Sequence, residues 1–182
     1  MALVYTYDPQ SNSWSIPKIT GVNTVRKEFL TGITDNNKKI YLWGGCYRML
    51  DNIHDCVFAN DMLILDTINL SWGKGSLINA PTPRDQYSAT LLPNNNIIYM
   101  GGYDTNKVNF DHKTMNINEG NALTLSEVYI YDTINDNWTT KITSGKIPTN
   151  RASFSSILGL DGQRVIIFGG AFANPGYLDT SL

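Results

Sequence analysis

One short segment gathers residue types that bind metals or form disulfides. Cys46, Asp51, His54 and Cys56 all fall between positions 46 and 56. Thiolate, imidazole and carboxylate groups are zinc ligands, yet their spacing lacks the paired C-x-x-C units of standard zinc patterns. Free thiols in a surface loop are therefore the preferred interpretation, and we predict no metal and no cofactor. A Cys46–Cys56 disulfide, which would pin the loop and indicate an oxidising compartment, stays open.

The histidines do not assemble a catalytic site. The chain has two, His54 and His112, which fall in separate segments. No G-x-S-x-G motif or comparable nucleophile pattern accompanies them. We predict no catalytic residues and a protein that is not an enzyme.

Most of the chain repeats one set of markers three times, the primary sign of a repeat architecture. The blocks YTYDPQSNSW, LILDTINLSW and YIYDTINDNW each place an Asp six residues before a Trp. An Arg follows each Trp after 12 or 13 residues, and a glycine pair that closes an apolar run follows each Arg after 17 or 18. The repeated residues are Asp8, Asp66, Asp132, Trp14, Trp72, Trp138, Arg26, Arg84, Arg151, Gly44, Gly45, Gly101, Gly102, Gly169 and Gly170.

Each repeat unit is predicted to form four short strands, because β-branched and aromatic residues alternate with clusters of turn residues. Such a sheet buries both faces only by stacking on similar sheets, so the tryptophans are expected to fill the space between blades. The glycine pairs suit positive φ or close backbone approach near a central channel. We expect the Asp residues to close tight turns and the Arg residues to bond backbone or acidic groups between strands.

The order of markers resembles the kelch repeat: Arg, an apolar strand ending in Gly-Gly, Tyr-x-Tyr-Asp, then Trp. The resemblance covers nearly the whole chain and implies an all-β protein, a β-propeller of kelch type with partner-binding rim loops. The same fold occurs in copper oxidases such as galactose oxidase, which need paired histidines and a tyrosine cross-linked to cysteine. Cys46 beside Tyr47 does not establish that constellation.

The strand count predicts a partial propeller of about three blades. The division is a half-blade at 1–20, blades at 21–78 and 79–144, and a half-blade at 145–182. We therefore expect the chain to be a fragment, a truncated copy or part of an assembly. One alternative is a homodimer in which each amino-terminal half-blade completes the other copy's carboxy-terminal half-blade.

Two insertions interrupt the repeat. Successive repeat tryptophans are 58 and 66 residues apart, against about 50 for a kelch unit. The excess lies at 46–60 and 103–125 and is expected to project from one rim, where long loops on a rigid scaffold usually bind partners. The predicted binding residues are Tyr47, Arg48, His54, Tyr103 and Phe110; variable loops without a function are the alternative.

Composition narrows the classes of partner. The chain is 42% hydrophobic and 16% charged with a net charge of −2, which predicts a globular domain without the basic surface that nucleic acid requires. No run reaches the roughly 18 apolar residues of a membrane span. The leading interpretation is a non-catalytic scaffold or adaptor that binds another protein. An extracellular oxidase, a carbohydrate-binding propeller and a truncated non-functional copy remain alternatives, and the compartment stays open, with the cytoplasm slightly favoured.

Overall fold

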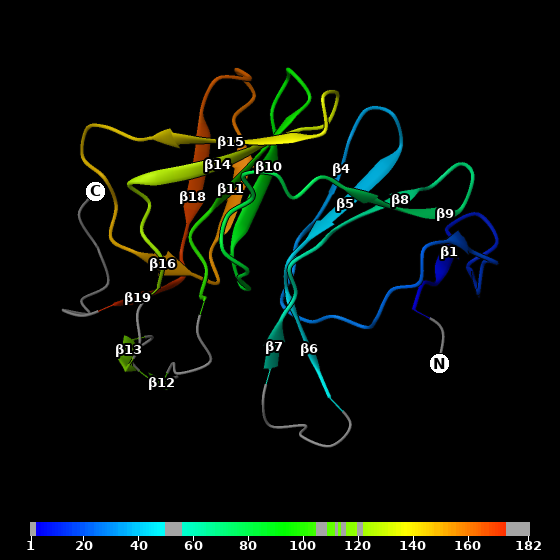
Figure 1. Ribbon diagram of the computed structural model, residues 1–182, viewed down its shortest axis with the longest axis horizontal. Coiled ribbons are helices and arrows are strands. Elements are labelled where there is room, and N and C mark those ends of the chain that lie inside the picture. The colour runs from blue at the N-terminus through cyan, green and yellow to red at the C-terminus, as the bar shows by residue number, and fades with distance from the viewer. Residues whose placement is uncertain are drawn as a thin grey trace.

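A computed structural model describes residues 3–49, 56–104, 109–111, 113, 116–119 and 122–173. In these ranges all regular elements are β-strands, and the strands form small, mostly antiparallel sheets set side by side (Figure 1). The predicted fold class, an all-β partial propeller, is confirmed.

The first complete blade has four antiparallel strands in chain order. They are β4 (Gly32–Thr34), β5 (Lys39–Trp43), β8 (Met62–Asp66) and β9 (Ser71–Gly75). The short strand β3 (Thr20–Gly21) adds a parallel edge to β9. Where β5 meets β8, Lys39 lies opposite Asp66 and Trp43 opposite Met62.

The second complete blade repeats this arrangement. Its strands are β10 (Ser88–Leu91), β11 (Asn96–Met100), β14 (Glu127–Asp132) and β15 (Asn137–Ile142). Asn96 lies opposite Asp132, as Lys39 lies opposite Asp66 in the first blade. The two blades therefore share one register, in which the residue five before the glycine pair faces the repeat aspartate.

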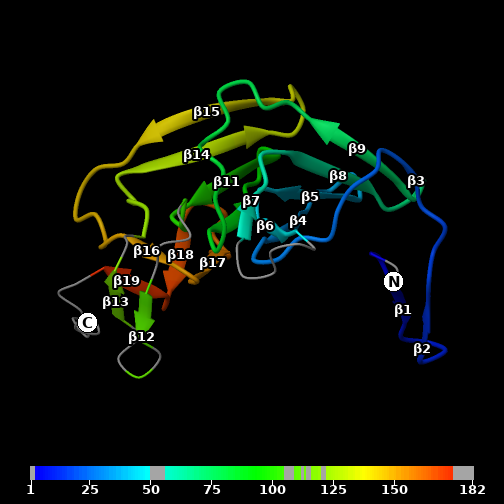
Figure 2. The same cartoon turned by 60° about the horizontal axis from the view of Figure 1, so that its bottom comes forward.

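Two hairpins flank these blades. One consists of β1 (Thr6–Asp8) and β2 (Ser13–Ser15), and the other of β17 (Ser155–Leu158) and β18 (Val165–Phe168). The β1–β2 hairpin lies at one end of the molecule, beyond the first blade (Figure 2). The β17–β18 hairpin contacts the second blade, with the Ser88 Oγ donating to the Ser156 Oγ at 2.7 Å.

The two insertions form strands of their own. β6 (Cys46–Arg48) and β7 (Cys56–Phe58) make a hairpin. β12 (Asn109–Asp111) and β13 (Asn116–Glu119) join β19 (Ala171–Ala173) and β16 (Arg151–Ala152) in a small sheet. Both insertions extend from the same side of the blades, the lower side in Figure 1.

The core is an aromatic cluster between the two complete blades. Trp43 is fully buried, and its ring centroid lies 5.2 Å from that of Trp138, 5.4 Å from that of Tyr87 and 5.6 Å from that of Tyr99. Large aromatic side chains contribute most of the hydrophobic stabilisation in such a contact. Stacking of the blades is thus what buries their faces, and the cluster comprises Tyr41, Trp43, Met62, Tyr87, Ala89, Ile97, Tyr99, Tyr131 and Trp138.

The three repeat tryptophans differ in burial. Trp138 is 1% exposed, Trp72 is half-buried and Trp14 is 71% exposed. The expectation that Trp14 fills an inter-blade space is wrong for this structure. Its hairpin has only two strands, and Trp14 packs on Tyr7 of the same hairpin, with ring centroids 5.0 Å apart.

Backbone contacts also join neighbouring blades at the glycine pairs. Gly101 has φ +62°, and a Cβ there would lie 2.4 Å from the carbonyl oxygen of Arg151. The same carbonyl accepts a hydrogen bond from the Gly102 N–H at 3.1 Å. A side chain at Gly101 would therefore both strain the backbone and push the next blade away.

Candidate interaction surface at one rim

The β6–β7 hairpin is fastened to the start of the first blade. Cys46 and Glu28 exchange backbone hydrogen bonds of 3.0 and 2.7 Å, and the Ala59 N–H donates to the Gly45 carbonyl at 2.8 Å. Arg48 lies opposite Cys56 across the hairpin. Because side chains alternate between the faces of a strand, Cys46, Arg48 and Cys56 share one face.

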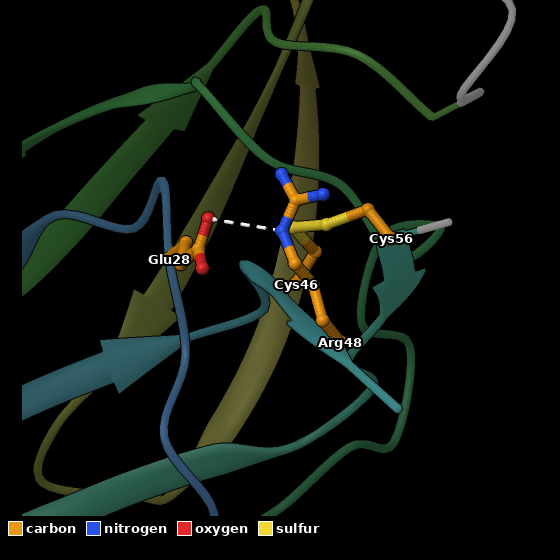
Figure 3. Close-up of a disulfide and its surroundings, with 4 residues drawn as sticks. All are labelled: Glu28, Cys46, Arg48 and Cys56. Carbon is orange, nitrogen blue, oxygen red and sulfur yellow. Dashed lines mark hydrogen bonds and ion pairs between the residues drawn. A yellow bond between two sulfur atoms is a disulfide. The ribbon is translucent and has the colours of Figure 1, made fainter. Parts of the chain in front are cut away.

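Cys46 and Cys56 form a disulfide, with a Cα–Cα distance of 5.6 Å (Figure 3). The interpretation as free thiols in a surface loop is wrong. Cys46 is fully buried, and the hairpin register brings both side chains to the same face. Of the other two residues proposed with them, Asp51 and His54 lie outside the described residues.

Arg48 forms an ion pair with Glu28, with the Arg48 Nε 3.5 Å from the Glu28 Oε2 (Figure 3). Both side chains are more than a third exposed, at 38% and 36%. An ion pair this open to solvent contributes little to stability. Its geometric effect is to hold the guanidinium beside the disulfide face of the hairpin.

Asp85 is a buried carboxylate next to the disulfide. It is 5% exposed, and its Oδ1 has no hydrogen-bond partner. Burial raises the pKa of Asp85 to about 6. Sequence reasoning did not select Asp85. The signal for it is its position, since the backbone bridge of Asp85 with Tyr103 repeats that of Glu28 with Cys46.

Tyr103 anchors the second insertion from within. It is 4% exposed and packs with Ile117, Ala122, Ala152 and Ala171. The expectation that Tyr103 contacts a partner at the surface is wrong, because this residue forms the small core that holds the insertion to the blade. Burial, with a smaller effect of the Asp85 charge, raises the pKa of Tyr103 to about 12.

The other predicted binding residues are placed as follows. Tyr47 is half-buried and Arg48 is exposed, both on β6. Phe110 lies in β12, where the backbone is described, and His54 lies outside the described residues. Met49, which sequence reasoning did not select, is 47% exposed directly after β6. The alternation of β6 gives the signal for it, since it places Met49 on the same face as Tyr47.

The repeat arginines Arg84 and Arg151 make matching hydrogen bonds to the backbone. The Nη1 of Arg84 donates to the Gly101 carbonyl at 3.3 Å, and the Nη1 of Arg151 donates to the Gly169 carbonyl at 3.2 Å. Each carbonyl belongs to the first glycine of the pair that ends the second strand. Arg26, predicted to share this role, is exposed. Lys27 precedes the Glu28–Cys46 bridge as Arg84 precedes the Asp85–Tyr103 bridge.

The repeat aspartates close turns. The Asp132 Oδ1 accepts the backbone N–H groups of Ile134 and Asn135, both at 2.9 Å, and Asp66 makes the equivalent bonds. These bonds favour the ionised form, so they hold the pKa of both carboxyls below the usual value. Their geometry is that of a turn and contains no group poised for chemistry.

The blades, their glycine pairs and their turn aspartates define a repeat-built β-propeller. The chain matches the family model described as the KLHDC2/KLHL20/DRC7 Kelch-repeats domain over residues 1–170. It belongs to the kelch-repeat family, so the resemblance inferred from the sequence is confirmed. Kelch-repeat domains are in general non-enzymatic modules for protein interaction.

The chain is also similar to the Rho GTPase-activating protein gacHH of Dictyostelium discoideum. The two are 28% identical over 107 residues, which is 58% of this chain and 6% of that protein. This chain therefore spans only a small part of the relative. Among the residues that the structure describes, no helix is long and apolar enough to cross a membrane.

Proposed function

We propose that this chain is a scaffold that binds a partner protein through the rim formed by the β6–β7 hairpin and the β12–β13 insertion. The observation that carries the proposal is that both non-repeating segments leave the blades on the same side (Figure 1). Each is fastened by an equivalent backbone bridge, Glu28 with Cys46 and Asp85 with Tyr103. A rigid repeat scaffold with variable segments on one rim is the usual arrangement of a binding surface.

The residues at the β6–β7 end of this rim have interface chemistry. Tyr47 and Arg48 are of types that anchor interfaces, and Met49 adds a flexible apolar contact. The Cys46–Cys56 disulfide restrains the hairpin that presents them. Such preorganisation lowers the entropic cost of binding.

Partner binding is proposed for the 182-residue chain alone, and no activity of a longer protein is included. The relative gacHH is named a Rho GTPase-activating protein, and the matched region is 6% of its length. That match supports a propeller segment carried within a larger protein. An adaptor role, in which such a segment brings a partner to the rest of the protein, follows from the same rim surface.

A capture experiment with matched variants tests the rim. The 182-residue chain is immobilised as wild type, as the triple variant Tyr47→Ala, Arg48→Ala, Met49→Ala, and as the control variant Ile68→Ala, Ile134→Ala. Ile68 and Ile134 are 71% and 69% exposed at turns on the opposite rim. Candidate partners identified by quantitative mass spectrometry are then purified and their affinities measured directly.

We expect the rim variant to bind a direct partner with an affinity at least about tenfold lower than wild type, since interface anchors of these types often contribute about 2 kcal/mol or more. The control variant should bind like the wild type. Equal binding by all three proteins, or equal losses in both variants, would place the interaction elsewhere.

A further inference from the structure

We infer that Cys46, Cys56 and Asp85 form a binding site for zinc or a zinc-like divalent cation when the disulfide is reduced. The Sγ atoms of the two cysteines and a carboxylate oxygen of Asp85 all lie within 4.8 Å of one another. Two of these residues come from the first insertion and one from the start of the second blade. The site therefore lies where the hairpin meets the neighbouring blade.

The second observation is the unpartnered oxygen of Asp85. Its Oδ1 is buried with no hydrogen-bond partner, and the residue is 5% exposed. A buried carboxylate oxygen without a partner is costly, so the Asp85 Oδ1 is suited to a cation. The basic residues beside the site have other partners: Arg84, which precedes Asp85, donates to the carbonyls of Thr82 and Gly101, and Arg48, beside the disulfide, pairs with Glu28 (Figure 3).

The donor set selects the class of cation. Two thiolates and one carboxylate suit zinc, whereas magnesium and calcium prefer oxygen ligands alone. Zinc–sulfur bonds of about 2.3 Å at a tetrahedral angle put two sulfurs roughly 3.8 Å apart. The sulfurs, bonded to each other in the oxidised chain, would move apart on reduction to a separation smaller than the 4.8 Å within which the three ligand atoms lie. With three protein ligands, the fourth position is left for water.

Reduction is the step that opens the site. A dithiol reductant transfers two electrons and two protons to the Cys46–Cys56 disulfide and is itself oxidised to a disulfide. The two thiols then lose their protons to solvent as the cation binds both thiolates. The hairpin would thus be cross-linked in both redox states, by the disulfide when oxidised and by the cation when reduced.

Metal titration of the purified chain tests this site without any partner protein. The chain is reduced with a phosphine and titrated anaerobically with Co²⁺ alone, and Zn²⁺ affinity is obtained by competition with a chromophoric chelator. We expect one equivalent of Co²⁺ to give thiolate-to-cobalt charge transfer and the intense bands of a tetrahedral site. The oxidised chain should show neither.

Variants then identify the ligands. Asp85→Asn should weaken Zn²⁺ binding by at least about tenfold, since even outer-shell changes cost about 10–100-fold in metal affinity. Glu28→Gln is the matched control, because Glu28 occupies the equivalent bridge position and faces Arg48; its affinity should stay within about twofold of wild type. Near-ultraviolet circular dichroism of the buried tryptophans checks that each variant is folded.

X-ray absorption of the zinc-loaded wild type needs no variant and should show two sulfur ligands with oxygen completing the shell. Failure of the reduced chain to bind Co²⁺ or Zn²⁺ would overturn the inference. So would a zinc shell without sulfur, or a folded Asp85→Asn variant that binds Zn²⁺ as tightly as wild type.

Discussion

Three tryptophans share one position of the repeat and have different surroundings. Trp138 contacts the rings of Trp43, Tyr99 and Tyr131 at 5.0 to 5.2 Å, and its Nε1 donates to the Ser76 carbonyl. Trp14 is 71% exposed. Trp138→Ala should therefore lower the free energy of unfolding by about 3–5 kcal/mol, and Trp14→Ala should lower that of the monomer by less than about 0.5 kcal/mol. Urea unfolding of the two variants measures both values, and equal losses would contradict this assignment.

The turn aspartates make an acid-sensitive contribution. Asp132 accepts two backbone N–H groups, and its pKa lies below the usual value of 3.8. A carboxyl with a lowered pKa stabilises the fold above its unfolded pKa, and this stabilisation is lost as the pH falls through the folded pKa. The contribution should thus fade below about pH 4.

The substitution Asp132→Asn removes the charge of the turn residue but keeps its hydrogen-bond acceptor. The amide keeps the Oδ1 acceptor but does not titrate, so this variant should lose less stability than wild type between about pH 5 and about pH 2. Asp132→Ala should be less stable than Asp132→Asn at neutral pH because the turn loses its acceptor. An NMR titration giving Asp132 a pKa at or above 3.8 would show that the turn bonds do not favour the ionised form.

Residue roles tied to the repeat were predictable, whereas those in the insertions were not. The repeat explains why Asp66 and Asp132 close turns, since turn geometry is local and short-range. The burial of Tyr103 and the Cys46–Cys56 disulfide depend on how insertions fold back on the blades. No repeat marker specifies which segments these contacts join. The sequence alone therefore left several arrangements open for the insertions.

At the scale of elements, the glycine pairs set how closely two blades approach. Gly101 and Gly169 are equivalent and have similar backbone angles, φ +62° and +72°. A Cβ at Gly101 would lie 2.4 Å from the Arg151 carbonyl oxygen, whereas one at Gly169 would meet nothing within 4 Å in the described structure. Comparing substitutions at Gly101 and Gly169 therefore separates the free-energy cost of backbone strain from the cost of the inter-blade contact.

Gly169→Ala should cost about 1–2 kcal/mol, the penalty of the left-handed conformation. Gly101→Ala should cost about 1–3 kcal/mol more, because the next blade must also move. Chemical denaturation of the two variants gives the difference. Equal costs would mean that the carbonyl contact does not hold the blades at this distance.

The disulfide is a second feature of element scale. It closes a loop of about ten residues, for which the chain-entropy model gives about 2–3 kcal/mol. The double variant Cys46→Ala, Cys56→Ala should lose about that much stability at neutral pH, while Ile142→Ala, 79% exposed on β15, should lose less than about 0.5 kcal/mol. Alkylation of the unfolded, unreduced chain should label neither cysteine; labelling of both would show free thiols.

The strands themselves were the most predictable elements. Apolar runs rich in β-branched and aromatic residues, before the glycine pairs and before the repeat aspartates, predicted the strands now numbered β5, β8, β11 and β14. The small sheet of β12, β13, β19 and β16 was not predicted. It pairs strands from distant parts of the chain, and β13 with β19 is a parallel pair, whose partner cannot be inferred from turn signals.

At the scale of the whole molecule, the two half-blades have complementary edges. β18 precedes its glycine pair as β5 and β11 precede theirs, and within the described residues it pairs with β17 alone. Ile166 and Phe168 on this hairpin are 56% and 82% exposed. In both complete blades the partner of this strand is the segment ending in the repeat aspartate, and β1 is the corresponding segment of the amino-terminal hairpin.

The shared register specifies how β1 of a second copy would fit on β18. In the complete blades, the residue five positions before the glycine pair lies opposite the repeat aspartate, as Lys39 lies opposite Asp66. Arg164 is five positions before Gly169. In the same register it would therefore lie opposite Asp8 of the second copy. Opposite charges directly across a strand pair are favourable, and exposed apolar strands seek a partner. We therefore expect the 182-residue chain to form a head-to-tail dimer in which each β1–β2 hairpin completes the other copy's last blade.

Sedimentation of the chain over a range of concentrations measures this association. Arg164→Glu should weaken the dimer by about fivefold or more, since it places like charges opposite each other at each of two junctions. Lys141→Glu, on the outer strand β15, makes the same change of charge away from the junction and should dimerise like wild type. A soluble monomer at every concentration would show that the half-blade edges do not pair between copies, and equal weakening by both variants would trace the effect to net charge.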